Sequence, residues 1–277
     1  MKISDITIGQ YFPGNSPVHR IDPRVKLTLT MVYVVMLFVA RNLLAMSVGV
    51  VFVLLAYLLA RISLRLIVRS VKPILPIIIF TAVINLFFVG GEPLWEIWVL
   101  TVTHEGVRIA IQMCVRILCL VAGTALLTYT TSPIALTDGI ELLFAPLKRL
   151  GAPVHEIAMM MTISLRFIPT LIEETEKIMS AQKARGADLE SGNIFQRVRA
   201  MLPILIPLFV SAFRRADELA LAMESRCYHG GEGRTRMRVL KTTAVDFFAV
   251  AFMVICLAAV IWANIMGPVL AQMGLFL

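Results

Sequence analysis

The sequence predicts an all-α membrane protein with about five transmembrane helices and a cytoplasmic module of long helices. Of its 277 residues, 58% are hydrophobic and 16% are charged, whereas an ordinary soluble domain has roughly 45–50% apolar and about 25% charged residues. Apolar runs of about 17–25 residues, long enough to span a bilayer, recur along the chain. These observations exclude a purely soluble enzyme and a disordered tail.

Five apolar segments are the expected membrane spans. They cover residues 25–40, 43–60, 73–89, 107–128 and 244–266. Only Arg41 and Asn42 separate the first two segments, which is a tight connection for a membrane hairpin. One of these two segments is therefore expected to be tilted or incompletely inserted.

The distribution of Lys and Arg predicts the orientation, because short cytoplasmic loops are enriched in these residues. Basic residues gather before the first span and after the second: Arg20, Arg24, Lys26, Arg61, Arg65, Arg69 and Lys72. The loop after the third span has no Lys or Arg and carries Glu92, Glu96 and Glu105. We therefore expect a multi-pass protein of the bacterial plasma membrane with a cytoplasmic N-terminus and an external C-terminus.

This orientation divides the chain into four parts. Residues 1–24 form a cytoplasmic N-terminal segment and residues 25–128 hold four transmembrane helices. Residues 129–243 form the cytoplasmic module, and residues 244–277 hold the final transmembrane helix and the external C-terminus. Because the N-terminal segment lacks the apolar stretch of a cleavable signal peptide, the first span is expected to direct insertion.

Three helical patterns occupy the cytoplasmic module. They cover residues 134–149, 154–186 and 194–228. The first is short and amphipathic and is expected to lie along the membrane surface. Pro169 predicts a kink in the second, and Pro203 and Pro207 stand early in the third. Each long pattern begins apolar and ends charged, so the module is expected to lean on the membrane part and on another protein.

The two long helical patterns end alike, at Ala184-Arg185-Gly186 and at Ser225-Arg226-Cys227. An Arg in the last turn complements the negative end of the helix dipole, and Gly186 can adopt the left-handed conformation that ends a helix. Either motif alone is typical of a capped surface helix. Their paired occurrence, with the arginines 41 positions apart, favours a docking function.

Small residues four positions apart share one face of each long helix: Ser180 and Ala184 in the first, Ala216 and Ala220 in the second. Small side chains let helix backbones approach closely. The sequence therefore predicts a tight helix crossing that holds two projecting guanidinium groups.

With these motifs, the chain resembles the T component of energy-coupling-factor (ECF) importers, the EcfT/CbiQ family, a branch of the ABC transporters. The resemblance extends over nearly the whole chain through the segments GNSPVHRIDPRVK, TTSPIALTDGIELLFAPLKRL, LRFIPTLIEETEKIMSAQKARGAD and AMESRCYHGGEGRTRMR. Two motifs of the Ala-Arg-Gly type, at the tips of cytoplasmic coupling helices, mark that family. The GGEGRTRMR tail and the outer loop resemble the shared type, in which one module serves several substrate-binding components.

The resemblance implies a non-catalytic subunit without a cofactor of its own. Two cytoplasmic ABC ATPase subunits would bind ATP and receive the coupling helices, and a membrane S component would bind a vitamin or another micronutrient. The family's motif residues carry over onto Ala184, Arg185 and Gly186, and onto Ser225, Arg226 and Cys227. Ser225 and Cys227 stand where Ala and Gly are usual, so the second helix is expected to stop less tightly and can run on to Gly230 and Gly231.

Other classes of protein fit the sequence less well. The chain has no Gly-Lys pair and so lacks an ATP-binding P-loop, and Cys227 and His229 lack a second pair of metal ligands nearby. Glu173 and Glu174 resemble the paired glutamates of CAAX-type proteases, but Ile178 stands where that motif has Arg. The net charge of +8 comes with no nucleic-acid motif. The alternative is a conventional ABC importer permease subunit, which has one coupling loop rather than two long coupling helices.

Arg116 lies well inside the fourth expected span. An Arg at mid-span costs roughly 2.5–3.5 kcal/mol on insertion scales. Its side chain is therefore expected to face protein or water, and Asn85 in the third span is its expected partner.

Overall fold

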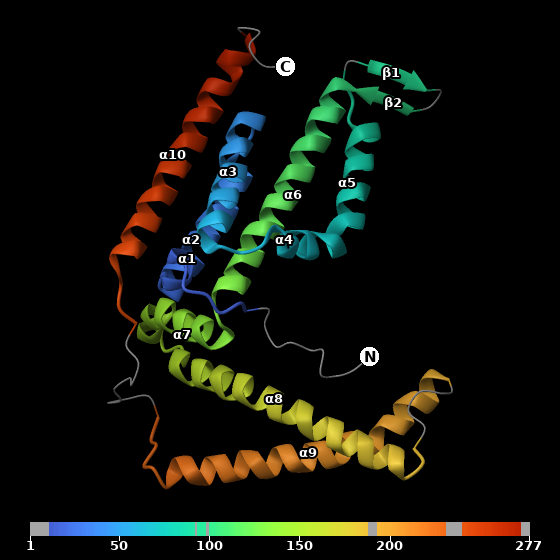
Figure 1. Cartoon of the computed structure of the whole chain (residues 1–277), viewed down its shortest axis with the longest axis vertical. Helices are drawn as coiled ribbons and strands as arrows, with labels where there is room; N and C mark the ends of the chain where they lie inside the picture. The colour runs from blue at the N-terminus through green and yellow to red at the C-terminus, as the bar shows by residue number, and fades with distance from the viewer. Residues whose placement is uncertain (1–10, 92, 98–99, 188–192, 231–239, 273–277) are drawn as a thin grey trace. The chain divides into compact units, whose positions relative to one another are not determined.

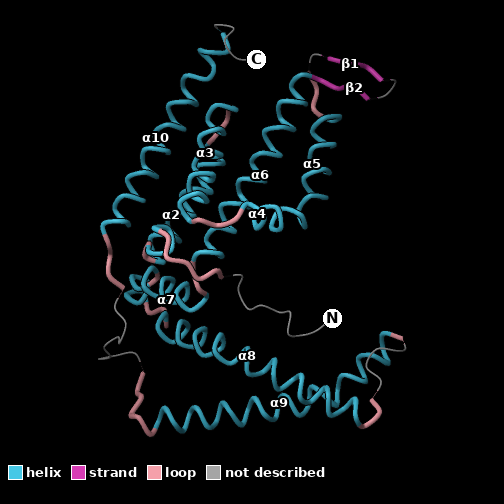
Figure 2. Tube along the Cα trace, in the orientation of Figure 1, coloured by secondary structure: helices cyan, strands magenta, loops and turns pink. Residues whose placement is uncertain are grey.

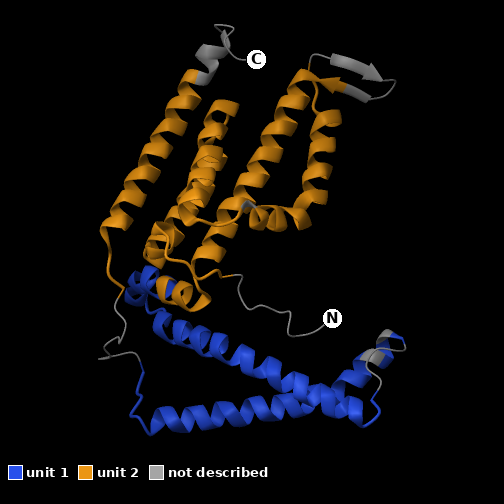
Figure 3. Cartoon of the chain, viewed as in Figure 1, with its two compact units in different colours: residues 1–9, 140–239 blue, residues 10–139, 240–277 orange. Residues whose placement is uncertain are grey.

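The computed structural model is described over residues 11–91, 93–97, 100–187, 193–230 and 240–272, where it is nearly all helical (Figures 1 and 2). The chain divides into two compact units (Figure 3). Residues 10–139 and 240–277 belong to one, here named the spanning unit, and residues 140–239 belong to the other, here named the two-helix unit. Helix α7 (Pro133–Leu143) contains the boundary between them.

The described residues of the spanning unit form six helices before α7, a short 3-10 segment, a β-hairpin and the last helix. Its helices are α1 (Pro17–Arg20), α2 (Pro23–Val39), α3 (Leu43–Ala60), α4 (Leu64–Val71), η2 (Lys72–Ile74), α5 (Leu75–Phe88), α6 (His104–Thr130) and α10 (Ala244–Gln272). The strands β1 (Pro93–Ile97) and β2 (Leu100–Thr103) pair in antiparallel fashion between α5 and α6.

Within the described residues, four helical segments are long and apolar enough to cross a membrane. They are Leu43–Ala60, Arg65–Phe88, His104–Thr130 and Ala244–Met266. Four of the five expected spans are thus found; the first, residues 25–40, corresponds to α2, which has only 17 residues. At a rise of 1.5 Å per residue this helix is about 25 Å long, shorter than the roughly 30 Å of a bilayer's hydrocarbon core.

Side chains at two helix starts explain where those helices begin. The Asp22 carboxylate accepts a hydrogen bond from the Arg24 N–H at 2.9 Å, and Pro23 occupies the first position of α2. The Thr103 hydroxyl accepts the Gly106 N–H at 3.0 Å and so caps α6. Both sequences place a capping residue directly before an apolar helix.

Two buried tyrosines join α2 and α3 to α6. The Tyr33 hydroxyl donates to the carbonyl oxygen of Cys119 at 3.3 Å, and the Tyr57 hydroxyl donates to that of Ala122 at 3.0 Å. Gly123 gives the Tyr33 ring its space, because a Cβ there would overlap a ring carbon. The polar ends of both tyrosines are thus satisfied inside an apolar core.

Polar side chains from α6 and α10 satisfy the backbone of the joint between α2 and α3. The Arg116 guanidinium donates to the carbonyl oxygen of Ala40 at 2.7 Å, and the Gln112 amide donates to that of Arg41 at 2.8 Å. From α10, the Asn264 amide donates to the Val39 carbonyl oxygen at 2.8 Å. Carbonyls freed where a helix ends need such donors at membrane depth.

The expectation that Arg116 pairs with Asn85 is therefore wrong. The Asn85 amide instead donates to the Thr81 carbonyl oxygen, one turn earlier in its own helix, at 2.8 Å. Arg116 instead donates to a backbone carbonyl at the C-terminal end of α2. The prediction considered only polar side chains of other spans, so it could not identify a main-chain partner.

The starts of α2 and α10 are tied together by a buried carboxylate. Asp246 accepts the Asp22 N–H at 2.8 Å and the Thr243 N–H at 2.6 Å. Lys26 lies nearby, 6% exposed, and its ammonium donates to the Thr130 carbonyl oxygen at 2.9 Å. These bonds join the N-terminal part of the spanning unit to its C-terminal helix and to the end of α6.

Two segments differ from the expected secondary structure. The loop expected after the third span contains the β1–β2 hairpin, in which Trp95 pairs with Val102 and Ile97 with Leu100. The helix expected over residues 134–149 is split into α7 and the 3-10 segment η3 (Ala145–Leu150). Pro146 explains the split, because proline cannot continue the hydrogen-bonding pattern of α7.

Candidate functional site

The two-helix unit is built on α8 (Val154–Ala184) and α9 (Ile194–Glu224), each 31 residues long. Pro169 lies inside α8, and Pro203 and Pro207 lie inside α9. The two helices cross in opposite directions: Gln182 of α8 contacts Pro203, whereas Glu174, eight residues earlier, contacts Ser211, eight residues later. Figure 1 shows this crossing near the C-terminal end of α8.

A carboxylate of α8 binds two side chains of α9 at the crossing. The Ser211 hydroxyl donates to Oε1 of Glu174 at 2.5 Å, and the Arg215 guanidinium donates to Oε2 at 2.7 Å. The hydrogen bond from Ser211 is the main reason that the pKa of Glu174 lies below its ordinary value, and Arg215 adds to the effect. The charged form of Glu174 therefore holds the two helices together.

A proline creates the second polar contact of the crossing. Pro207 has no N–H, so the carbonyl of Pro203, four residues earlier, loses its partner within the helix. The Gln182 amide of α8 donates to this oxygen at 3.3 Å. The early prolines of α9 therefore do more than bend the helix, because one of them exposes an acceptor for α8.

The C-terminus of α8 has the hydrogen-bond pattern of a Schellman motif. The Gly186 N–H donates to the Lys183 carbonyl oxygen, and the Ala187 N–H donates to that of Gln182, both at 3.0 Å. Gly186 has φ +85°, in the left-handed region that favours glycine. Arg185 is the C-cap residue, directly after the last residue of α8.

The C-terminus of α9 repeats this pattern with different residues. The Cys227 N–H donates to the Glu224 carbonyl oxygen at 2.9 Å, and the Tyr228 N–H donates to that of Met223 at 3.1 Å. Cys227 has φ +55° and so takes the position of Gly186. The expectation of a looser stop is wrong: α9 ends at Glu224 and does not run on to Gly230.

Both motif arginines therefore occupy the same position in two matching helix ends. Arg185 and Arg226 are exposed. Within the described residues, neither guanidinium has a hydrogen bond or an ion pair, and backbone N–H groups cap the carbonyls of both helix ends. Helix capping by their side chains therefore does not account for these two arginines.

The other motif positions leave the two tips open. Ala184, Gly186, Ser225 and Cys227 are all exposed, and a Cβ at Gly186 would meet nothing within 4 Å. The Ser225 hydroxyl donates only to the Ala222 carbonyl oxygen of its own helix, at 3.0 Å. In each tip, the exposed arginine is therefore flanked on both sides by a small motif residue.

The small residues expected at the helix crossing lie elsewhere. Ser180, Ala184, Ala216 and Ala220 are exposed in the structure. The hydrogen bonds between the helices involve Glu174, Gln182, Pro203, Ser211 and Arg215, on other faces of α8 and α9. These polar residues were not predicted from the sequence, although the proline pair in α9 signals a freed carbonyl that needs a donor.

The described residues contain no cluster of three or more His, Cys, Asp or Glu side chains that could hold a metal ion. Instead, the first part of α9 exposes large apolar side chains along its length: Phe195, Val198, Met201, Leu202, Leu205, Ile206, Phe209 and Phe213. The arrangement can support contact with other macromolecules or with lipid at these apolar faces, and charge-assisted hydrogen bonding at the two tips.

Comparison with known proteins gives the same family over most of the chain. A family model described as "Cobalt transport protein" (CbiQ) matches residues 14–237. The chain is 54% identical over 245 residues to the "Energy-coupling factor transporter transmembrane protein EcfT" of Thermosediminibacter oceani, covering 88% of this chain and 92% of that protein.

Two further relatives carry the same description. The protein of Acidaminococcus fermentans is 52% identical over 263 residues, which cover 94% of this chain and 98% of the relative. That of Lactococcus lactis subsp. cremoris is 40% identical over 265 residues, which cover 95% of this chain and all of the relative. The similarity thus includes the spanning unit and both long helices.

Proposed function

Because this chain belongs to the EcfT/CbiQ family and is a transmembrane component of energy-coupling factor transporters, we propose that α8 and α9 are its coupling helices. It is a non-catalytic, multi-pass membrane protein. In the proposed mechanism, Arg185 and Arg226 insert into the surfaces of two cytoplasmic ABC ATPase subunits. Closure of the ATPases on ATP then moves the two tips, and the rigid helix crossing transmits the movement toward the membrane.

The observation that carries this proposal is the matching geometry of the two tips. Two helix ends of different sequence have the same hydrogen-bond pattern, and each leaves its arginine free of partners within the described residues. A guanidinium without an internal partner can make charge-assisted hydrogen bonds to carboxylates or carbonyls of another protein. Two equivalent tips match two equivalent ATPase subunits.

The proposed orientation places both tips in the cytoplasm. It depends on the basic residues around α1 and α4, such as Arg20 and Arg65, and on the absence of Lys and Arg between residues 90 and 106. Cys introduced at Gly90, in the exposed loop after α5, would then react with an impermeant thiol reagent from outside only. Cys227, at the second tip, would react only after the membrane is opened.

The proposed membrane partner is a substrate-binding S component that takes up vitamins or other micronutrients. The exposed apolar side chains of α9, among them Phe209 and Phe213, supply a surface for such a hydrophobic partner. The shared arrangement, in which one module serves several S components, is part of the same proposal. Mass spectrometry of proteins that co-purify with the tagged chain tests it, since a single S component would contradict sharing.

The decisive experiment measures substrate uptake by proteoliposomes that contain this chain, both ATPases and one S component. We expect Arg185→Ala or Arg226→Ala to reduce uptake strongly, and the double variant to lose most ATPase association, because each charge-assisted contact is worth about 1.5–3 kcal/mol. Lys at either position should restore uptake only in part, since an ammonium lacks the bidentate geometry.

Arg199→Ala is the matched control, because Arg199 is an exposed arginine of the same helix α9, away from the tip. It should leave uptake and assembly unchanged. Uptake near the wild-type level in the Arg185→Ala, Arg226→Ala double variant would end the coupling proposal. The same result would place the ATPase contact in another part of this chain.

A further inference from the structure

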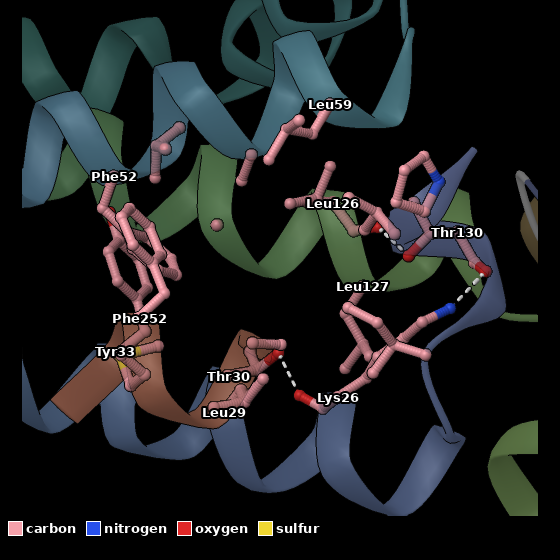
Figure 4. Close-up of a pocket in the computed structure, with 18 of the residues that line it drawn as sticks. Lys26, Leu29, Thr30, Tyr33, Phe52, Leu59, Leu126, Leu127, Thr130 and Phe252 are labelled. Atoms are coloured by element: carbon pink, nitrogen blue, oxygen red, sulfur yellow. Dashed lines mark hydrogen bonds between the residues drawn. The ribbon is translucent and has the colours of Figure 1, made fainter. Parts of the chain in front are cut away.

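A cavity of about 340 Å³ lies inside the spanning unit, among α1, α2, α3, α6 and α10 (Figure 4). Phe52, Phe252 and Tyr33 form one end of it, where their rings stack: the ring centroids of Tyr33 and Phe52 are 5.1 Å apart, and those of Phe52 and Phe252 are 5.7 Å apart. Pro17, Ile21 and Val245 line the cavity where α1, α2 and α10 begin.

The cavity offers no free polar group to an occupant. Four polar side chains line it, and each already binds a backbone carbonyl: Lys26 that of Thr130, Thr30 that of Lys26, Tyr33 that of Cys119 and Thr130 that of Leu126. A water molecule needs two to four polar partners to remain in such a space. The natural occupant is therefore apolar.

The cavity opens between side chains that suit lipid. Leu59, Phe248 and Phe252 line it and are 54%, 72% and 38% exposed. They belong to α3 and α10, two of the helices that are apolar enough to cross a membrane. An apolar cavity with an apolar rim in a spanning unit is accessible to the hydrocarbon chains of the bilayer.

Positive charge gathers where the helices around the cavity begin. Arg20 ends α1, directly before the lining residue Ile21, and Lys241 precedes α10. Arg24 reaches across to the Leu240 carbonyl oxygen at 3.4 Å, which brings these two stretches together. Asp22 and Asp246 are 5% and 4% exposed, and Asp22 is already paired with the Arg24 guanidinium at 3.8 Å, so Arg20 and Lys241 carry the accessible charge of these two stretches.

We propose that the cavity binds one acyl chain of an anionic phospholipid, whose headgroup phosphate lies against Arg20 and Lys241. Burial of each methylene group drives the chain into the cavity. The basic side chains select the headgroup, with a preference of about fivefold for each Lys or Arg near the phosphate. The bound lipid then fills the space between α2, α3 and α10 as part of the folded protein. This proposal is independent of the coupling function.

The test uses the full-length chain with its three Trp residues changed to Phe and one new Trp reporter. Phe52→Trp places the reporter in the cavity, and Phe247→Trp, on the exposed side of α10 and outside the cavity, reports on bulk lipid. Both proteins are reconstituted in phosphatidylcholine with traces of phosphatidylglycerol brominated on its acyl chains, which quenches Trp fluorescence on contact. We expect quenching of the Phe52→Trp protein to exceed that of the Phe247→Trp protein and to saturate at a low fraction of brominated lipid.

Two variants check the parts of the site separately. Ala249→Phe fills the cavity and should remove the excess quenching, whereas Ala258→Phe, on an exposed face of the same helix, should not. Arg20→Gln with Lys241→Gln should lower the preference for phosphatidylglycerol over equally brominated phosphatidylcholine, whereas Arg65→Gln with Arg69→Gln should not.

Equal quenching of the cavity reporter and the bulk-lipid reporter would overturn the acyl-chain site. Equal quenching of the cavity reporter by the two lipids would overturn the anionic headgroup.

Discussion

The guanidinium of Arg116 donates to the carbonyl oxygen of Ala40 at 2.7 Å, across 76 positions of sequence. Ala40 is 1% exposed and is the C-cap residue of α2. Because the helix stops here, no further turn supplies an N–H to the Ala40 carbonyl oxygen. The charge in the middle of α6 therefore compensates for the break between α2 and α3. The cost of inserting this charged side chain is thus offset by the hydrogen bond that it donates to another part of the chain.

Arg116→Leu should separate insertion from folding. Removing the charge saves roughly 2.5–3.5 kcal/mol on insertion, but leaving the buried Ala40 carbonyl without its best donor costs about 1–3 kcal/mol. The variant should insert as well as the wild type, measured by protease protection, and unfold in detergent at a lower temperature. Arg108→Leu, at an exposed position near the start of the same helix, should unfold like the wild type. An unchanged unfolding temperature for Arg116→Leu would show that the bond is dispensable.

The two helix tips should respond in opposite directions to exchange of their left-handed residues. A residue with a side chain pays roughly 1–2 kcal/mol in this conformation, so Gly186→Ala should weaken the first tip and Cys227→Gly should strengthen the second. Hydrogen exchange of the Ala187 and Tyr228 amides, which close the two motifs, measures each tip separately. Slower exchange at Tyr228 in Cys227→Gly is expected; faster exchange would contradict the strain at Cys227.

The crossing of α8 and α9 should weaken in acid. The folded pKa of Glu174 lies below its ordinary value of 4.5, so its stabilising effect is present above that value and is lost as the pH falls through the folded pKa. A double-mutant cycle of Glu174→Gln and Arg215→Gln should give a coupling energy of about 0.2–1 kcal/mol, because both side chains are partly exposed.

Ser211→Ala tests the hydrogen bond that the Ser211 hydroxyl donates to Glu174 at the same crossing. It removes the main cause of the lowered pKa of Glu174 and should shift the acid transition to a higher pH. Ser164→Ala is the matched control, since the Ser164 hydroxyl donates only to the Met160 carbonyl oxygen of its own helix. Identical acid transitions in both variants would show that Ser211 does not set the pKa of Glu174.

The segment before α2 should also depend on pH, through His19. Its Nε2 donates to the Phe12 carbonyl oxygen at 3.0 Å, and its Nδ1 lies 2.7 Å from the Ser16 hydroxyl, which donates to it in the neutral ring. Burial is the main reason that the pKa of His19 lies below 6.5, and the charge of Lys26 acts in the same direction.

The neutral ring is therefore the stable form in the folded protein. The contribution of His19 to stability is complete above pH 6.5 and declines as the pH falls toward the folded pKa. Proteolysis between Phe12 and Arg20 should become faster over that interval in the wild type and independent of pH in His19→Asn. His104→Gln, at an exposed position, serves as the control and should keep the wild-type dependence.

Close packing of α2 on α6 should make Gly123 intolerant of a side chain. A Cβ at Gly123 would overlap the ring of Tyr33, which is 2% exposed and cannot move away. Gly123→Ala should lower the free energy of unfolding by about 1–3 kcal/mol through overpacking. Gly90→Ala, where a Cβ meets nothing within 4 Å, should be far milder, and equal thermal stability of the two variants would contradict the packing argument.

Properties that repeat along the chain could be predicted from the sequence. The all-α membrane class follows from the apolar runs, and the positions of α8 and α9 follow from their helical patterns. The expected first residues of both helices agree with the structure, and the expected last residues lie two and four positions beyond those observed. The paired motifs at Arg185 and Arg226 depend only on order along the chain, so they too could be found. The family assignment is confirmed by the comparisons.

Contacts that depend on one irregular backbone position could not be predicted. The partner of Arg116 is a carbonyl that becomes free only where α2 ends, and the partner of Gln182 is freed by Pro207. Cys227 adopts a conformation that its side chain disfavours, because the two backbone bonds around it outweigh the strain. Residue types do not reveal such cases, since the deciding atom belongs to the main chain.

The height of the α2–α3 hairpin has a consequence for the surrounding lipid. Lys26 binds Thr130 at one end of α2 and Ala40 binds Arg116 at the other, so 14 residues of α2 match 14 residues of α6, a rise of roughly 21 Å. The hydrocarbon core is about 30 Å thick. A hydrophobic length below this thickness is matched by local thinning of the bilayer or by snorkelling of flanking side chains, at a cost of a fraction of a kcal/mol per Å. The elastic energy of this mismatch therefore depends on membrane thickness. It is smaller in membranes with short lipid tails and larger in membranes with long ones.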